Sequence, residues 1–191
     1  IAASSLSLDL PAATAGIINS KQNINSSSYL ALVAGSKFIQ NPYTFANIQL
    51  NHSSDLAGLI CASAEITEAW FSPAGYNRGQ LKNVSQLLFN PRKTFRDDLY
   101  KQNINSVINE PGGGILLLGD RTNQLKTSAM SNINVRRLFI VLQKAIKETA
   151  KFILFEINDE YTRSNFRSLV TQYLREIQSR RGVTDFRVVC D

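Results

Sequence analysis

The sequence predicts a mixed α/β fold of the α+β type, in which two long amphipathic helices accompany a mixed sheet. Two stripes of apolar residues recur at three- and four-residue steps in the last third of the chain, the spacing of helices with one buried face. Short apolar runs bounded by Gly, Pro and Asn precede them, as is typical of strands. With 191 residues and 43% hydrophobic content, the chain can bury one sizeable core or a core plus part of a second.

The first 50 residues give weaker signals. Residues 1–28 are rich in Ser, Ala and Asn with little periodicity, so we expect loop or arm structure there and no independent domain. Two strands are predicted next, at residues 29–34 and 44–50, on either side of a turn at Asn41-Pro42.

A helix is predicted over residues 56–66, because residues 53–55 (SSD) provide N-cap side chains and apolar residues follow at helical spacing. Residues 70–81 (WFSPAGYNRGQL) hold two Gly and one Pro among aromatic and polar residues, which indicates an ordered connector between two modules. We therefore place a domain boundary in this segment.

A helix and a buried strand are predicted next, separated by a glycine-rich turn. Thr94 and Asp97 form a capping-box pattern that opens a helix running toward Asn105. Residues 110–114 (EPGGG) end that region, and residues 115–118 are predicted as a buried strand. A phosphate-binding loop follows a strand and opens a helix with Gly-Lys-Ser/Thr, whereas these glycines precede the strand and no lysine follows. A phosphate site is therefore not indicated.

The strongest periodic signals lie in the last third of the chain. Apolar residues from Val135 to Leu154 form one stripe over about five helical turns. A second helix is predicted to begin at Asn158 or Asp159 as its N-cap and to stop at Gly182. Its apolar face comprises Phe166, Leu169, Val170, Tyr173, Leu174 and Ile177.

Residues 183–190 are predicted as a final strand, because apolar residues alternate through it. A sheet that ends in such a strand presents a row of unpaired N–H and C=O groups, to which another chain can pair. The edge residues that we assign are Val183, Phe186, Val188 and Cys190.

The formal net charge is +6, and residues 133–191 carry eleven Lys or Arg against seven Asp or Glu. Such an excess indicates a solvated surface or an acidic partner, which could be nucleic acid, an anionic membrane or an acidic protein. Most of the nearby aromatic residues fall on the apolar helical stripes, where we assign them to the core and not to base stacking. A basic nucleic-acid-binding module is kept as the alternative function.

Candidate catalytic and metal-binding side chains are few. His52 is the only histidine, and we interpret it as a surface or capping residue, because no nucleophile signature such as GxSxG accompanies it. A hydrolase is therefore only a third hypothesis. Glu156, Asp159 and Glu160 cluster at a predicted helix start, where the helix dipole favours acidic residues, so no metal site is assigned. We expect no enzyme and no cofactor.

The two cysteines, Cys61 and Cys190, have no CxxC spacing and no nearby ligands, so neither a zinc site nor a disulfide framework is indicated and a reducing compartment is expected. The first residues carry Asp9 and Pro11, lack a basic segment and contain no run long enough to span a bilayer. Because there is no initiator Met, we expect the chain to begin in mid-sequence or after processing.

Several blocks of sequence are distinctive enough to indicate a family. The two most diagnostic are residues 133–139 (INVRRLF) and 155–160 (FEINDE). The others are residues 55–59 (DLAGL), 70–80 (WFSPAGYNRGQ), 115–122 (ILLLGDRT) and 186–191 (FRVVCD). Together they resemble the C-terminal part of sheath proteins from contractile-tail bacteriophages of the myovirus type.

This resemblance implies a domain organisation. Residues 1–69 would be an arm and the end of a preceding sheath domain with a subtilisin-like fold, residues 70–81 a connector, and residues 82–191 the sheath C-terminal domain. The family's outer domains would precede Ile1, and its last strand and C-terminal arm would follow Asp191. The sheet would then be incomplete at both chain ends and completed by strands from neighbouring subunits.

The resemblance also implies a function. The subunit would be a structural protein that polymerises as stacked hexameric rings around an inner tube and contracts to drive the tube through the host envelope. Its partners would be further copies, the inner tail tube protein, and the baseplate and tail terminator proteins, with no membrane insertion and no direct nucleic-acid contact. Its place would be the tail sheath of the virion, and the host cytoplasm during assembly. The expected contacts to an acidic tube are Lys144, Lys147, Lys151, Arg175, Arg180 and Arg181.

Overall fold

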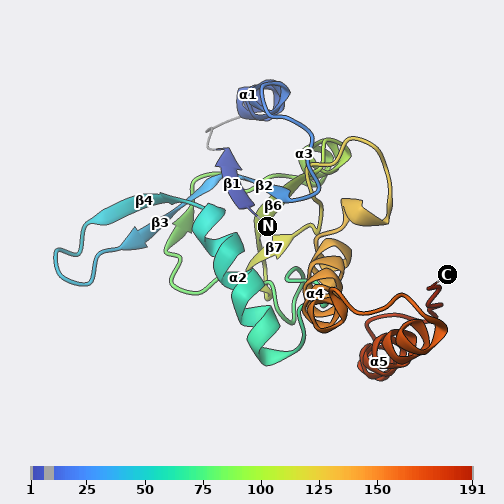
Figure 1. Ribbon diagram of the computed structural model, residues 1–191. Coiled ribbons are helices and arrows are strands. Elements are labelled where there is room, and N and C mark those ends of the chain that lie inside the picture. Colours follow the sequence, from blue (N-terminus) through green and yellow to red (C-terminus); the bar gives the residue numbers. More distant parts are fainter. Residues whose placement is uncertain (1, 7–10, 191) are drawn as a thin grey trace. The chain divides into compact units, whose positions relative to one another are not determined.

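A computed structural model describes residues 2–6 and 11–190, which divide into two compact units after Arg137 (Figure 1). The predicted connector at residues 70–81 lies inside the first unit. Its backbone is bonded to the sheet, since the amide of Gly75 donates to Leu117 O over 3.0 Å and that of Leu81 to Ile115 O over 2.8 Å. Because of these bonds, residues 70–81 pack with the first unit, and the boundary between the two compact units falls after Arg137 instead.

The first unit contains a mixed sheet with the strand order β1-β2-β6-β7, formed by β1 (Ala2–Leu6), β2 (Leu30–Ala34), β6 (Ile104–Glu110) and β7 (Gly114–Leu118). β1, β2 and β6 are parallel, and β7 is antiparallel to β6. The predicted mixed α+β class is confirmed, as are the strands now seen as β2 and β7.

The expectation of loop or arm structure at residues 1–28 is wrong. β1 pairs in register with all five residues of β2, and α1 (Pro11–Gln22) follows it. The helix is only weakly amphipathic, but it buries Ile17 completely. Among the residues of α1 whose burial is described, Ile17 is the one buried apolar side chain. One such contact and a strand stabilised by its neighbour leave little periodicity for a sequence pattern to reveal.

A second sheet has the order β4-β3-β5, with β3 (Ser36–Gln40), β4 (Asn47–Asn51) and β5 (Gln86–Leu87). Figure 1 shows the β3–β4 hairpin extending away from the rest of the first unit. The strand predicted at 44–50 is β4, but its partner across the turn is β3, which the sequence did not predict. Gly35, with φ +94°, redirects the chain from β2 into β3, a backbone conformation that favours glycine.

Two predicted helices are confirmed as α2 (Ser53–Ile66) and α3 (Lys93–Lys101), but both predicted caps are wrong. The N-cap residues are His52 and Arg92, and neither makes a side-chain capping bond. α3 also ends before the predicted Asn105, because that residue belongs to β6, where buried polar and apolar residues are mixed and hide the strand pattern.

The core of the first unit lies on both faces of β2. Ala31 and Val33 contribute to a cluster with residues of α2, β6, β7 and the first residue of α4, whereas Leu32 and Ala34 face a second cluster with α1 and α3. This alternation is what a strand buried on both faces requires. The first cluster comprises Ala31, Val33, Leu56, Leu87, Val107, Leu117 and Ile133.

The second unit contains most of α4 (Ile133–Ala150), a short 3-10 turn η2 (Lys151–Ile153) and α5 (Glu160–Ser179). Both long helices were predicted, and Asp159 is the N-cap, since its carboxylate accepts the Thr162 amide over 2.8 Å. α5 ends in a Schellman motif whose left-handed residue is Arg181, with φ +62°, one position before the predicted Gly182. None of the described helices is long and apolar enough to cross a membrane.

The predicted strand over residues 183–190 is not formed in the structure. A strand is stabilised by the ladder of a neighbouring strand, and no strand lies in the described part of the second unit. The segment is instead attached through side chains: the Gln178 amide donates to Thr184 O and the Arg167 guanidinium to Cys190 O, each over 2.8 Å.

Candidate interaction surfaces

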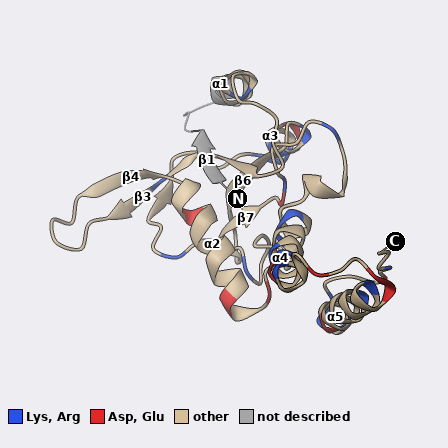
Figure 2. Ribbon diagram, in the orientation of Figure 1, with Lys and Arg blue, Asp and Glu red and all other residues tan. Residues whose placement is uncertain are grey.

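The six cations predicted to contact a partner are all exposed, on the C-terminal half of α4, on η2 and at the end of α5. Figure 2 shows Lys and Arg positions on α4 and α5 in blue. Two of them form ion pairs within their own helical segment. Lys151 Nζ lies 2.8 Å from Glu148 Oε2, and Arg180 lies 2.7 Å from Glu176 Oε1. Exposed pairs of this kind contribute little to stability, so Lys151 can exchange Glu148 for an acidic partner at little cost. The remaining members of the set are Lys144, Lys147, Arg175 and Arg181.

The predicted strand-edge residues lie in a segment whose backbone is largely unpaired. Among the residues described, no backbone-to-backbone hydrogen bond involves residues 183–190. Phe186, Val188 and Cys190 are half-buried and alternate with exposed Arg187 and Val189, which is the side-chain pattern of a strand with one covered face. The segment thus has the pattern of a strand without a strand partner.

Another surface, which the sequence did not predict, is formed by the connection between α4 and α5 and the first residues of α5. We call residues 152–161 the apolar linker. Phe155 is fully exposed at 103% and has φ +70°, an unusual backbone conformation for a bulky residue. The stripe predicted to continue to Leu154 ends with α4 at Ala150, so Leu154, which was assigned to that buried face, is 60% exposed. The exposed apolar members are Phe152, Leu154, Phe155, Ile157 and Tyr161, with exposed fractions from 60% to 103%.

Soluble monomers rarely expose contiguous apolar patches of this kind, and larger ones mark interaction sites. Glu156 lies beside Phe155 in the linker and, among the described residues, forms no ion pair. The apolar linker therefore exposes the aromatic ring of Phe155 beside the carboxylate of Glu156.

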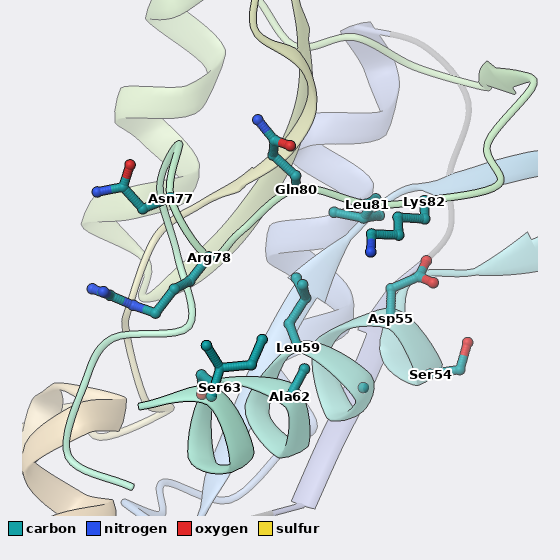
Figure 3. A pocket seen from close by; sticks show the side chains of 12 residues that line it. Ser54, Asp55, Leu59, Ala62, Ser63, Asn77, Arg78, Gln80, Leu81 and Lys82 are labelled. Atoms are coloured by element: carbon teal, nitrogen blue, oxygen red, sulfur yellow. The ribbon is translucent and has the colours of Figure 1, made fainter. Parts of the chain in front are cut away.

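The last surface is a groove of about 520 Å³ in the first unit, between α2 and residues 77–82 (Figure 3). We call it the α2 groove. Gly58, Ala62 and Ile66 follow one another at four-residue steps along α2, so they lie on one face of the helix. Because the first two positions carry small residues, little side-chain volume covers this face of α2. The apolar lining is completed by Leu59 and Leu81.

The rim of the α2 groove is positively charged. Arg78 is oriented by a hydrogen bond from its Nε to Ser72 O over 2.7 Å and by the Phe71 ring, 5.3 Å away, and Lys82 is exposed. Among the described residues that line the groove, Asp55 is the one carboxylate.

The Asp55 carboxylate already has two buried hydrogen-bonding partners, Lys37 and His52. Lys37 Nζ lies 2.7 Å from one carboxylate oxygen, and His52 Nδ1 lies 3.1 Å from the other. Burial acts to raise the pKa of Asp55, but the hydrogen bonds to His52 and Lys37 outweigh it, so the pKa lies below its ordinary value. The carboxylate is therefore ionised at neutral pH and committed to these partners, which leaves the groove rim cationic.

Of the two interpretations of His52, as a surface or a capping residue, the surface one is wrong. Its side chain is 2% exposed, and it occupies the N-cap position of α2 without making a capping bond. The opposite edge of its ring lies against Gly35, where an added Cβ would be 3.5 Å from Cδ2. A general base must reach the proton that it removes, and this imidazole is enclosed by protein.

Asp159 and Glu160, two of the three acidic residues near the start of α5, make local contacts. Hydrogen bonds from Thr162 lower the pKa of Asp159, and Glu160 lies 3.5 Å from Arg163 and 3.9 Å from Arg167. Across residues 2–6 and 11–190, no group of three His, Cys, Asp or Glu side chains is placed to hold a metal ion.

Comparison with known proteins gives the family. Residues 125–191 match the family model of the phage tail sheath C-terminal domain. The chain is also 45% identical over 170 residues to the tail sheath protein of Vibrio phage KVP40, an alignment that covers 88% of the chain and 25% of that relative. The chain belongs to the tail sheath proteins.

The tail sheath protein of Enterobacteria phage T4 is 40% identical over 166 residues, covering 87% of the chain and 25% of the relative. The sheath chain thus spans about a quarter of the length of the relatives that it matches. The resemblance predicted from the sequence is confirmed.

Two solved structures share the fold. One is the PVC sheath complex of an extracellular contractile injection system in the contracted state, with a TM-score of 0.82 and 21% identity over 97% of the sheath chain and 50% of that chain. The other is the helical sheath of the anti-feeding prophage in the contracted state, with a TM-score of 0.75 and 21% identity over 93% and 45% of the two chains. At this identity the likeness shows the fold alone.

Proposed function

We propose that the chain is part of a structural subunit that polymerises helically around an inner tube and contracts to drive the tube through the host envelope. The observation that carries the proposal is the 45% identity to a tail sheath protein over 88% of the chain. Because the chain spans a quarter of that relative, the proposal concerns the complete subunit to which this segment contributes.

The physical basis of such a polymer is a set of heterologous contacts. A contact between two different surfaces does not close on itself, so repeated copies build rings or open helical filaments. The first unit has sheet-and-helix layers with two apolar clusters, which suits a body that moves as a rigid piece between two packings. The stored energy of contraction would then lie in contacts between subunits, and no enzymatic step is needed.

The partners that we propose are further copies in stacked hexameric rings, an inner tail tube protein, and the baseplate and tail terminator proteins. The place of the subunit would be the virion tail, after assembly in the host cytoplasm. Residues 1–69 would end a preceding sheath domain, and residues 82–191 would form the C-terminal domain.

We assign the edge residues Val183, Phe186, Val188 and Cys190 to a strand that forms between subunits. Pairing with an arm of a neighbouring copy would be β-augmentation, in which main-chain hydrogen bonds hold two chains together. The unpaired backbone of residues 183–190 supports this assignment, because its N–H and C=O groups have no backbone partner among the described residues. The strand predicted from the sequence would then appear only in the assembled sheath.

We assign the six exposed cations to an acidic tube. Charge complementarity sets the register of two surfaces and can be released without exposing a hydrophobic core. Their location on α4, η2 and α5, within residues 125–191, supports a role in the C-terminal domain.

The test is assembly of the complete subunit, with the sequence on both sides of this segment present, examined by negative-stain electron microscopy. Hollow striated tubes are expected on concentration or on addition of an inner-tube protein. A monodisperse particle under both conditions would contradict the proposal. If such a particle bound DNA with a steep salt dependence, the nucleic-acid alternative would replace it.

A further inference from the structure

Two exposed surfaces of the chain carry apolar side chains and opposite charges. The apolar linker in the second unit projects five large apolar side chains into solvent, and the α2 groove in the first unit is an apolar depression of about 520 Å³. A groove of this volume lies in the range that accommodates small ligands, so it has room for an aromatic side chain and its neighbours.

The groove is uncovered in the same way as the linker. Ile66, at the end of its apolar stripe, is 77% exposed, and an added Cβ at Gly58 would meet no atom within 4 Å. Both surfaces therefore present apolar area to water.

The charges of the two surfaces are opposite. Arg78 and Lys82 line the groove, and its carboxylate, Asp55, is committed to Lys37 and His52. The linker carries Glu156 next to Phe155, its most exposed apolar residue. If Phe155 enters the groove, Glu156 is brought to the cationic rim, where an opposite charge is favoured and helps to set the register.

We infer that the apolar linker of one copy of this chain inserts Phe155 into the α2 groove of a second copy. The contact is heterologous, because donor and acceptor are different surfaces. Each copy that donates a linker therefore keeps a free groove, and each that accepts one keeps a free linker. Such a contact propagates along a filament instead of ending at a dimer. The inference rests on the proposed function, since a helical polymer of copies is the setting in which this contact operates.

The test is a mixed disulfide between two differently tagged copies of the complete subunit, both carrying Cys61→Ser and Cys190→Ser. One copy carries Phe155→Cys, and the other carries one of the groove substitutions Gly58→Cys, Ala62→Cys or Ile66→Cys. Because a disulfide requires Cα atoms within about 7 Å, it forms only where the linker is seated. Placing the two cysteines on separate chains excludes a bond within one chain.

The matched control is Ala64→Cys, which is exposed on the same helix but does not line the groove. Thiol labelling of every variant checks that each cysteine is accessible and each subunit folded. We expect at least one groove position to give a disulfide carrying both tags at tenfold or higher yield than Ala64→Cys. Equal yields at groove and control positions overturn the inference.

The outcome separates this contact from the proposed function. Tubes that form without the mixed disulfide overturn the contact and leave the sheath function standing. The mixed disulfide without tubes, when the subunit with its natural cysteines also forms none, supports the contact and contradicts the sheath function. As a second measurement, Ala62→Trp is expected to reduce tube formation at least tenfold by filling the groove, whereas Ala64→Trp is expected to leave it unchanged; equal assembly of the two variants counts against the contact.

Discussion

Arg137 donates a hydrogen bond from Nη1 to the Ser63 hydroxyl over 3.0 Å, with both residues buried, and so connects the start of α4 to the last turns of α2. A second bond runs from Nη2 to the carbonyl of Ile60, also over 3.0 Å. Burial lowers the pKa of Arg137 from its usual high value, but the guanidinium remains charged at any ordinary pH. The two bonds therefore satisfy a buried cation that would otherwise be costly.

We expect Arg137→Met to lower the free energy of unfolding by about 2–3 kcal/mol, because the Ser63 hydroxyl and the Ile60 carbonyl lose a charged donor. Urea denaturation followed by circular dichroism measures this difference. Lys151→Met, which removes an exposed cation with a local ion pair, is the control and should change stability by less than about 0.5 kcal/mol. Equal losses in the two variants would show that the buried hydrogen bonds stabilise the protein no more than the exposed ion pair does.

The ionisation of Asp55 makes the stability of the first unit depend on pH. Its folded-state pKa is depressed, so its contribution is complete well above the ordinary value of 3.8 and is lost as pH falls below 3.8 through the lower folded pKa. We expect Asp55→Asn to cost about 3 kcal/mol at pH 7, because Lys37 is left buried without its counter-charge.

The difference between the two proteins should shrink as the pH is lowered toward 2, where the native carboxylate is also protonated. Urea midpoints of both proteins between pH 2 and pH 7 provide the measurement. A constant difference across this range would exclude ionisation of Asp55 as the source of the stabilisation.

Two glycines are expected to respond in opposite ways to alanine. At Gly79 an added Cβ would lie 2.7 Å from the backbone nitrogen of Gly75, closer than a real Cβ approaches, so Gly79→Ala should destabilise the connector. At Gly58, inside α2, nothing lies within 4 Å, so Gly58→Ala should stabilise the protein by up to about 1 kcal/mol through helix propensity. Thermal unfolding of the pair tests both signs, and a stabilising Gly79→Ala would contradict the packing described for residues 75–81.

The sequence predicted elements whose residue pattern lies within one segment. It missed elements that depend on contacts between segments far apart in the chain. α5 was found with its N-cap, because Asp159 and a long apolar face both lie within one segment. β6 was missed, because Asn105 is fully buried and bonded through its side chain to Leu32 O over 2.8 Å, so a polar residue occupies a core position. Only the neighbouring strand explains why it is tolerated there.

The interaction surfaces divide in the same way. The exposed cations could be named from charge and helical position, because a cation off an apolar stripe faces solvent. The apolar linker could not be named, since Leu154 continues the four-residue spacing of the α4 stripe and only the end of the helix at Ala150 places it outside. The α2 groove depends on residues 77–82 lying beside α2, a long-range contact that no local spacing records.

Arg181 allows stability and function to be separated at one position. It holds the left-handed conformation at the end of α5, with φ +62°, where glycine is favoured. We expect Arg181→Gly to raise the free energy of unfolding by about 0.5–1 kcal/mol, because the strain exceeds the added entropy of the unfolded glycine. Chemical denaturation checks the sign. If Arg181 contacts the tube, the same variant should bind the tube less well although it is more stable.

The tube assignment is tested by reversing charge at positions without local ion pairs. Lys144 and Lys147 lie exposed on α4, and changing both to Glu alters the net charge by four units without removing a described salt bridge. Complementary charges mainly accelerate association and set register, so we expect slower and more salt-sensitive binding to an inner-tube protein, with the loss largest at low ionic strength. The control is the pair Lys93→Glu and Lys126→Glu, exposed in the first unit, which makes the same change in net charge. Co-sedimentation with tubes measures both variants. A loss confined to the α4 pair supports a local contact, an equal loss in both indicates only a long-range field, and undiminished binding of the α4 pair removes these lysines from the tube interface.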